Sequence, residues 1–575
     1  MARRISRPPV SSRQSPLKAA GLKPDPRPVL MAEKRDPDGA RAVLSAYGLR
    51  DPDQADRNLN AMAGDPIQRR RLADILPMML ESISRTADPD QALNHWERML
   101  GSVSRTSFLD YLRTWPRMLD LLCAIFGNSD ALTFTLLRDT TLVYWLAEEK
   151  VLSKPPTRKG LERALQESIG HLTSKEVKLD ALRRFRRREM LRIGVRDLLR
   201  LATVPETTGS LSDLASLLIH AAYEIVDADL KQQYGVPMHQ NRQGRWVETR
   251  FAVIGMGKLG GHELNYSSDV DLLYIYESDD GETRAQARKR VAAPPGIGIS
   301  NEEYFEILSR ELTRALSEPT REGHVFRVDL RLRAEGSVGQ LARSLASYQR
   351  YYLARGQVWE RLALLKAAPV AGSPELGQSF VKTVKPFIFG VGKKSPDLAD
   401  AALVVEEVRA VKDMIDGKMV GRGHEHRNVK LGTGGIREIE FFAQTLQVLA
   451  GKQLPAVVDR STLGALERFA RWKLISEQEK DDLTVAYVFL RDVEHKLQMV
   501  HDLQTHSLPA EMQELERCAI RMGYGTGDRT KAAELFLADH QRYTTVVHRA
   551  FQSLFSQPKT SHVLQATLRA IKARS

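Results

Sequence analysis

Two acidic residues separated by one position, Asp269 and Asp271, stand at the start of an apolar, partly β-branched segment, Val270 to Tyr276. On a strand, residues two apart point to the same face, so the two carboxylates are expected side by side. Like charges held together are costly unless a cation neutralises them, and Mg²⁺ binds through a few carboxylates together with substrate phosphates. The pair therefore predicts a metal site for phosphate chemistry.

A third carboxylate is expected from segment 325–333, in which apolar residues alternate with Arg327, Asp329, Arg331 and Arg333. This period of two predicts a strand with one face in the core and Asp329 among the arginines on the other face. Asp329 could bridge metal ions or take a proton from an attacking hydroxyl, and the arginines could hold phosphates. For this strand alone, a solvated face of paired charges is an equally good interpretation.

A glycine-rich turn precedes the acidic pair and follows the short apolar segment 250–254, which predicts another strand. Its backbone N–H groups and one lysine could face a phosphate chain. The candidate phosphate ligands are Gly257, Lys258, Gly260 and Gly261.

The same glycines, with Gly255, also fit the GxGxxG pattern of dinucleotide-binding folds, and Glu277 could serve as the ribose ligand. Spacing argues against that fold. Eight residues separate Gly261 from Val270, too few for the crossover helix that parallel strands require.

Helical patterns flank this region on both sides. Asp88-Pro89 with Gln91 is a helix-start signal, and Ser300 with Glu303 predicts a capping box before a helix of about four turns. The basic run 183–188 is expected to enter an amphipathic helix as solvated arginines, with a phosphate grip as the alternative. The segment 434–438 predicts a helix start that either touches an anion or forms a tight turn.

The predicted fold is α+β and predominantly helical, with a small α/β unit between two helical blocks. The expected divisions are a disordered basic tail at 1–37, an N-terminal helical domain at 38–235, a catalytic core at 236–340 and a C-terminal helical domain at 341–575.

Composition narrows the classes of partner. The net charge is +13, but the first thirty residues alone hold seven Lys or Arg against one Asp, so the rest is too mildly basic for a dedicated nucleic-acid binder. No segment approaches the apolar length of a membrane span. Two cysteines, Cys123 and Cys518, are too few for a disulfide framework, which predicts a cytoplasmic location.

Longer strings carry a family resemblance. Gly257-Lys258, followed after ten residues by Asp269-Val270-Asp271, resembles the polymerase-β-type nucleotidyltransferase motif. The wider text resembles the glutamine synthetase adenylyltransferase family, on the strings GMGKLGGHELNYSSDVDLLY, VFRVDLRLRAEGSVGQLARSLASYQRYY and NVKLGTGGIREIEFFAQTLQ. Family members usually carry two catalytic halves: one transfers AMP from ATP to a tyrosine of glutamine synthetase, and the other removes it with phosphate, releasing ADP.

The resemblance implies one such half, with a polymerase-β-like unit inserted between helical bundles. It implies Mg²⁺ at Asp269, Asp271 and Asp329, with ATP, ADP and phosphate as substrates or products. The implied nucleotide site consists of Gly257, Lys258, Gly260, Gly261, Ser268, Arg331 and Arg333. Met256, Asn265 and the Ser267-Ser268 pair resemble the removing half more than the transferring half.

The implied partner is glutamine synthetase, with a PII-type signal protein as a further candidate. Two alternatives stay open: a catalytically silent regulatory protein that binds either of them, and a protein AMP-transferase with another target. The sequence leaves open which direction of the reaction the chain catalyses and whether a separate chain supplies the other half.

Overall fold

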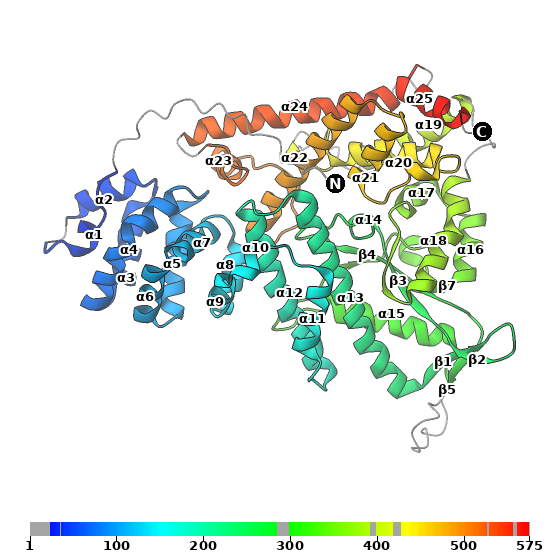
Figure 1. Cartoon of the computed structure of the whole chain (residues 1–575), viewed down its shortest axis with the longest axis horizontal. Coiled ribbons are helices and arrows are strands. Elements are labelled where there is room, and N and C mark those ends of the chain that lie inside the picture. Colours follow the sequence, from blue (N-terminus) through cyan, green and yellow to red (C-terminus); the bar gives the residue numbers. More distant parts are fainter. Residues whose placement is uncertain are drawn as a thin grey trace.

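The structure, a computed structural model, describes residues 23–34, 36–284, 298–390, 398–417, 427–525, 528–555 and 560–573. Within these residues the chain is predominantly helical with small β-sheets, which confirms the predicted α+β class. The N-terminal helices form one end of an elongated molecule (Figure 1). The sheets lie toward the other end, among helices from the middle and the C-terminal part of the chain.

Four successive helices near the N-terminus begin with the same local signal, an Asp followed by a Pro. The Asp side chain accepts the N–H three residues later, and Pro occupies the first helical position, where its missing N–H costs nothing. The start predicted at Asp88 is confirmed as one of them. The helices are α2 (Pro37–Ala46), α3 (Pro52–Ala63), α4 (Pro66–Ser84) and α5 (Pro89–Ser102).

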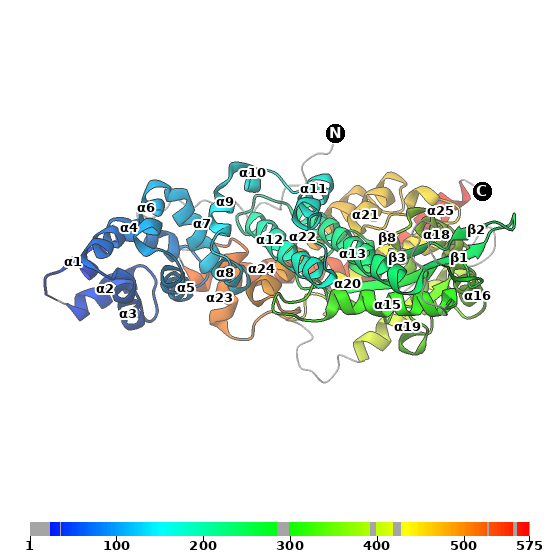
Figure 2. The same cartoon turned by 90° about the horizontal axis from the view of Figure 1, so that it is seen from below.

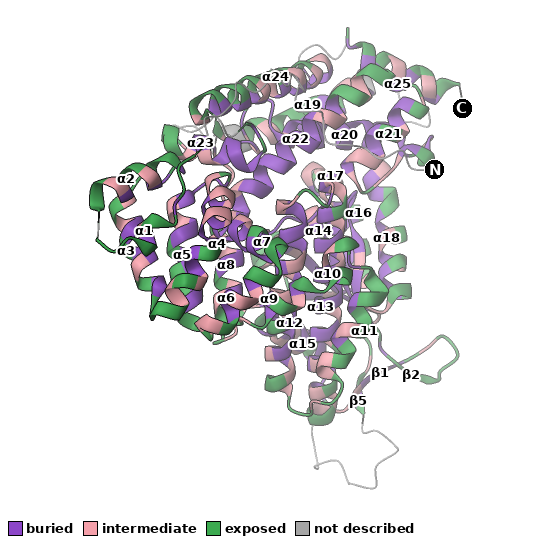
Figure 3. Ribbon diagram, turned by 60° about the vertical axis from the view of Figure 1, so that its left-hand side comes forward, coloured by how far each residue is buried: buried purple, intermediate pink, exposed green. Residues whose placement is uncertain are grey.

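The other helices before the sheets are α1 (Pro28–Met31), α6 (Arg105–Thr114), α7 (Pro116–Phe126), α8 (Asp130–Arg138), α9 (Leu142–Ala147), α10 (Glu149–Ser153), α11 (Arg158–Ile169), α12 (Lys175–Leu198) and α13 (Val204–Tyr234). Those that follow are α14 (Gly257–Gly260), α15 (Asn301–Ser317), α16 (Leu345–Ala354), α17 (Val358–Leu364), α18 (Pro374–Phe389), α19 (Leu398–Gly417), α20 (Ile436–Ala450), α21 (Thr462–Arg471), α22 (Glu477–His501), α23 (Met512–Arg521), α24 (Arg529–Phe555) and α25 (His562–Lys572). Buried residues dominate α20 and α22, with α24 on their outer side (Figure 3).

The central sheet has the strand order β6-β4-β3-β8, with β7 also paired to β4. Its strands are β3 (Phe251–Gly255), β4 (Val270–Tyr276), β6 (Val328–Asp329), β7 (Ala342–Ser344) and β8 (Ala368–Gly372). Because β3 and β4 run antiparallel with α14 as the helix between them, the parallel crossover of a dinucleotide fold is absent from this hairpin. A smaller sheet has the order β2-β1-β5, from β1 (Val236–Gln240), β2 (Trp246–Glu248) and β5 (Glu282–Arg284).

Strand β4 is apolar throughout because both of its faces are covered. Leu272, Tyr274 and Tyr276 pack into a core with α13 and α15, whereas Leu273 and Ile275 pack into a core shared with α16, α18 and α20. This alternation follows the period of two along a strand. The sheet is thus a layer between helices, visible in two directions (Figures 1 and 2).

The third predicted strand is much shorter than expected. Segment 325–333 was expected to be extended throughout, but β6 covers Val328–Asp329 and the chain then turns. Arg333 causes part of this difference, because its guanidinium donates to the carbonyls of Leu330, Ser337 and Gly339 and so folds the chain back on itself.

Strands β7 and β8 lie beyond residue 340, where the sequence predicted helices, so the sheet extends past the expected end of the catalytic core. The sequence of β8 contains a single β-branched residue and a proline. Such a composition is tolerated at the edge of a sheet but gives little strand signal.

The basic run 183–188 differs from its prediction as solvated arginines. It lies inside α12, and Arg183 is buried, donating to the carbonyls of Ala315 and Glu318 at the end of α15. Arg187 bonds the carboxylate of Glu322 at 2.8 Å. The orphan carbonyls at a helix end attract these cations, which the helical period of α12 alone does not reveal.

The expected basic tail lies partly outside the described residues, which begin at Lys23. The described part packs onto the N-terminal helices: Lys23 forms an ion pair with Glu81 at 2.8 Å, and Leu30 of α1 is buried. Disorder was expected up to residue 37, so this segment differs from the expectation. No helix in the described part of the chain combines the length and apolar character needed to cross a membrane.

Candidate active site

The structure brings two of the three predicted carboxylates side by side. Strands β4 and β6 pair in parallel, with Val270 opposite Val328 and Asp271 opposite Asp329. Asp269 directly precedes β4, two positions before Asp271. The two-residue strand β6 therefore suffices to place Asp329 beside the acidic pair.

Arginines bond two of these carboxylates. Arg327 donates from Nε to Asp269 at 2.6 Å, and Arg331 donates from its backbone N–H to Asp329 at 2.8 Å and from its guanidinium to the same carboxylate. Although burial opposes it, the bonds from Arg331 lower the pKa of Asp329 below its usual range. Arg331 is thus at the predicted site, whereas Arg333 is buried and bonds backbone carbonyls.

Asp271 is the member of the set whose pKa is raised. Burial, followed by the charges of Asp329 and Asp269, raises the pKa of its carboxyl to about 6, and Lys430 and Arg437 oppose the rise. Perturbed carboxyls that result from burial and a like charge mark candidate functional sites.

Lys430 and Arg437 were missed as site residues from the sequence. They lie more than 150 residues from Asp271 along the chain, and no spacing rule connects them. Their positive charges reduce the rise that burial and the neighbouring carboxylates cause in the pKa of Asp271. The sequence offered one indication that they belong to the site: both lie in the string NVKLGTGGIREIEFF, which resembles the family.

The glycine-rich turn touches the carboxylates directly. Gly257 begins α14 with φ of +52°, and a Cβ built there would lie 2.4 Å from Oδ2 of Asp271. Gly260 and Gly261 have a different reason to be glycine. A Cβ at Gly260 would lie 2.0 Å from the carbonyl oxygen of Lys366, and one at Gly261 would lie 3.1 Å from that of Arg460.

Replacing Gly257 by Ala is therefore expected to lower the free energy of unfolding by about 1–3 kcal/mol, because the left-handed backbone is strained and the new methyl group meets Asp271. Urea unfolding measures the effect. Gly244→Ala is the matched control, since Gly244 has φ of +73° and open space around its Cβ position. Equal losses in the two variants would contradict a close approach of Gly257 to Asp271.

Lys258 points into the protein rather than standing free beside the glycine turn. Its ammonium forms an ion pair with Glu494 of α22 at 2.8 Å, and its side chain is 13% exposed. Burial lowers the pKa of Lys258 to about 7, with Glu494 opposing the shift and Arg491 and Lys430 adding to it. The predicted role of Lys258 at a phosphate stays a prediction.

The segment between the glycines and the acids is anchored to α22. Ser267 donates its hydroxyl to Asp502 and its backbone N–H to Gln498. The side-chain oxygen of Asn265 accepts from buried Arg491. Ser268 is half-buried next to Asp269, and its predicted role in nucleotide binding stays a prediction.

Glu494 is the centre of a buried charge network that sequence analysis missed. Besides Lys258, it faces His506 at 2.9 Å and Arg491 at 3.4 Å, and its carboxylate is fully buried. Burial opposes ionisation, yet Lys258, Arg491 and the hydrogen bond to His506 hold the pKa of Glu494 well below its usual range. The network fixes α14 to α22, so it positions the glycine turn.

A second buried network holds the other end of this segment. The ammonium of Lys366 bonds Glu263 at 2.8 Å and Glu440 of α20 at 3.1 Å. Although burial opposes it, the two carboxylates raise the pKa of Lys366 above its usual range. The segment from the glycine turn to the acidic pair is therefore held between α20 and α22 by paired charges.

The glycine pair before α20 forms a tight turn. The N–H of Ile436 donates to the carbonyl of Val429, and that of Arg437 donates to the carbonyl of Lys430. The N–H groups of Gly435 and Glu438 also reach backbone carbonyls. Of the two interpretations of this segment, the backbone hydrogen bonds support the tight turn. The turn places the side chain of Arg437 near Asp271.

The donor chemistry of Asp269, Asp271 and Asp329 fits a hard divalent cation such as Mg²⁺. Burial and the neighbouring Asp329 raise the pKa of Asp271, so a cation bound beside it would favour its ionised form. Across the described ranges, no group of three or more His, Cys, Asp or Glu side chains is arranged to hold a metal ion. In this arrangement Arg327 and Arg331 bond two of the three carboxylates.

Comparison with known proteins places these features in a family context. Residues 119–383 match the family model described as glutamate-ammonia ligase adenylyltransferase. Residues 409–555 match the model described as GlnD PII-uridylyltransferase. The first match contains β3, α14, β4 and β6, and thus all three carboxylates and the glycine turn.

Two curated relatives are named bifunctional glutamine synthetase adenylyltransferase/adenylyl-removing enzyme. The protein of Nitrosococcus oceani is 35% identical over 442 residues, which cover 77% of this chain and 43% of that protein. The protein of Burkholderia mallei is 37% identical over 378 residues, which cover 64% of this chain and 39% of that protein. The chain thus spans less than half the length of these relatives. Residues 119–383 thus carry a glutamate-ammonia ligase adenylyltransferase domain, and the chain is about 35% identical over most of its length to relatives named for that activity.

Proposed function

We propose that this chain is a nucleotidyltransferase that controls the adenylylation state of glutamine synthetase, by phosphorolytic removal of AMP from an adenylyl-tyrosine. The observation that carries the proposal is the register of β4 and β6, which sets Asp271 beside Asp329 against the glycine turn. The names of the relatives, adenylyltransferase and adenylyl-removing enzyme, supply the substrate class.

In the proposed reaction an oxygen of inorganic phosphate attacks the α-phosphorus of adenylyl-tyrosine. A new P–O bond forms, the bond from phosphorus to the tyrosine oxygen breaks, and the products are ADP and tyrosine, whose oxygen takes up a proton. Arg331, Lys430 and Arg437 supply positive charge at a centre where the phosphate oxygens carry negative charge.

Asp269, Asp271 and Asp329 are the residues that would hold Mg²⁺. When bound, this ion supplies charge neutralisation at the phosphate oxygens and the leaving oxygen. The glycine turn, with Gly257, Gly260 and Gly261, lets the backbone approach the substrate phosphates closely, and Ser268 lies next to the carboxylates.

AMP transfer from ATP to tyrosine is the second candidate, because the printed names of the relatives include both directions. In that direction Asp329 would help to remove the proton of the tyrosine hydroxyl. The match of residues 409–555 to a PII-uridylyltransferase model supports a PII-type protein as a further proposed partner. The buried, unpaired cysteines Cys123 and Cys518 fit the reducing, cytoplasmic location that we propose.

The experiment offers the protein adenylylated glutamine synthetase with phosphate and Mg²⁺ and, in parallel, unmodified glutamine synthetase with ATP and Mg²⁺. The expected result is ADP release in the first arm, measured by chromatography. AMP incorporation in the second arm alone would reverse the proposed direction. If neither arm turns over, while a pull-down retains glutamine synthetase after Ala replaces Asp269, Asp271 and Asp329, the chain is a regulatory binding protein.

A further inference from the structure

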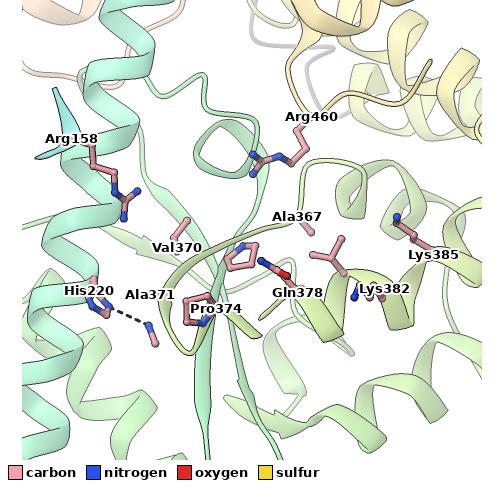
Figure 4. Close-up of a pocket in the computed structure, with 13 residues that line it drawn as sticks. Arg158, His220, Ala367, Val370, Ala371, Pro374, Gln378, Lys382, Lys385 and Arg460 are labelled. Atoms are coloured by element: carbon pink, nitrogen blue, oxygen red, sulfur yellow. Dashed lines mark hydrogen bonds between the residues drawn. The ribbon is translucent and has the colours of Figure 1, made fainter. Parts of the chain in front are cut away.

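A cavity of about 570 Å³ lies at the edge of the central sheet, apart from the carboxylates. The edge strand β8 forms its floor, α13 one wall and α18 the opposite wall, with Arg460 above (Figure 4). Its volume is within the range of cavities that hold small molecules in proteins, about 300–1,000 Å³.

The cavity is lined by cations from several elements. They are Arg158, Lys382, Lys385 and Arg460, and His220 lines the cavity beside them. Among the described residues that line it, none is acidic. Two carboxylates contact lining residues: Glu162 bonds Arg158 at 3.0 Å, and Glu224 lies 3.6 Å from His220.

Within the described residues, Lys382 and Lys385 make no ion pair or side-chain hydrogen bond, and both are exposed. Lysines that remain unpaired on one wall, facing further cations on the other, give the cavity a positive field that attracts anions. Because these cations come from separate elements, an anion bound there would contact α11, α18 and the Arg460 segment at once.

Apart from Gln378, the remaining lining is mainly apolar and includes Pro369, Val370, Pro374 and Val381. The edge of β8 is poorly suited to pairing with another strand, because Pro369 has no N–H and the N–H of Gly372 already donates to Nδ1 of His220 at 3.3 Å. Figure 4 shows this bond inside the cavity. The geometry therefore favours a compact ligand with an apolar part over an extended acidic peptide.

We propose that this cavity binds a phosphorylated small molecule of nucleotide size. Its phosphates would meet Lys382, Lys385 and Arg460, and its ring system would lie on Pro369 and Val370. The proposal stands apart from the proposed catalytic function, because none of its residues belongs to the carboxylate site.

The cavity is connected to the glycine turn by direct contacts. Arg460 donates from Nη1 to the carbonyl of Gly260 at 3.2 Å, and Ala367 in the lining follows Lys366, which bonds Glu263. A phosphate that competes for the guanidinium of Arg460 would change the support of Gly260. Occupancy of the cavity is therefore expected to change the turnover of the carboxylate site.

The test is calorimetric titration of the full chain with ADP in the presence of EDTA, which removes divalent cations from the carboxylates. One ADP is expected to bind per chain. The double variant Lys382→Glu/Lys385→Glu is expected to bind at least about tenfold more weakly, because it replaces two attractive charges by repulsive ones. Lys531→Glu, at an exposed lysine of α24, is the matched control and is expected to bind as the wild type does.

Asp271→Asn separates this site from the catalytic one. Unchanged ADP binding by Asp271→Asn together with weakened binding by the double variant supports the proposal. Equal binding by the double variant and the wild type overturns it, as does loss of binding in Asp271→Asn alone or no binding at millimolar ADP. Pyrophosphate is expected to bind more weakly than ADP, and equal affinity would overturn the apolar part of the site. If a polyglutamate peptide displaces ADP with an affinity equal to that of ADP, the ligand of the cavity is an acidic peptide instead, and the proposal is overturned.

Discussion

Asp271→Asn is expected to lower the proposed AMP removal by about 10³-fold and, at the same time, to stabilise the folded protein. Asn keeps the shape of the side chain, so the glycine turn at Gly257 still fits against it. It removes the charge that a bound divalent cation and the substrate phosphates would require. The activity is measured as ADP released from adenylylated glutamine synthetase, at saturating phosphate and Mg²⁺.

The gain in stability follows from the pKa of Asp271, which burial and the neighbouring Asp329 raise to about 6. The folded protein holds this proton more tightly than the unfolded chain, so the wild type loses stability as the pH rises from roughly 4 to 6. Above about pH 6 the carboxyl of Asp271 is ionised in the folded protein as well, and the loss of stability reaches its full size. In EDTA at pH 8, the free energy of unfolding of Asp271→Asn is expected to be about 1–3 kcal/mol higher than that of the wild type.

Urea unfolding of both proteins in EDTA at pH 8 and at pH 4 measures this difference, which is expected to shrink at the lower pH. Asp280→Asn, in the exposed loop after β4, is the matched control and is expected to leave both activity and stability unchanged. A variant that loses stability at pH 8 would contradict the account of Asp271 as a buried, incompletely compensated charge.

Glu494→Gln is expected to produce the largest loss of stability, about 3–5 kcal/mol. The substitution keeps the volume but removes a fully buried negative charge that contacts Lys258, Arg491 and His506. Breaking a buried pair from one side leaves the remaining cations without compensation. Urea unfolding at pH 7 measures the effect, and a loss of activity is expected with it because α14 is held through Lys258.

Asp481→Asn, on the same helix, is the matched control, because Asp481 is 64% exposed and pairs with Lys480 at the surface. Exposed pairs contribute at most about 1 kcal/mol. The pH dependence adds a further check. The pKa of Glu494 is held well below its usual range, so its contribution is present above the unfolded pKa and is lost as the pH falls toward the folded value. Similar losses in Glu494→Gln and Asp481→Asn would contradict the network.

Local rules were enough to predict the residues of the acidic pair and the elements that carry them. The period of two placed Asp269 and Asp271 on one face, β4 has the predicted bounds, and the side chain of Ser300 caps the helix α15 as expected. The capping box was predicted as a reciprocal pair, and the structure shows the bond from the N–H of Glu303 to Ser300.

Long-range partners could not be predicted in this way. The position of Asp329 beside Asp271 depends on the register of two strands that lie about 60 residues apart in the sequence. Glu494 and Lys430 reach the site from distant segments, and nothing in their local sequence distinguishes a buried, paired charge from a solvated one. The arginines of α12 show the same limit, because their partners are carbonyls at the end of α15.

The fate of labelled phosphate distinguishes phosphorolysis at the carboxylate site from the other proposed reactions. Adenylylated glutamine synthetase is incubated with this protein, Mg²⁺ and inorganic phosphate that carries a radioactive phosphorus label. The label is expected in the β-position of ADP with wild-type protein and is expected to be absent with Asp271→Asn, because phosphate attacks the α-phosphorus at the carboxylate site. Release of unlabelled AMP, or equal labelling of ADP by the two proteins, would contradict it.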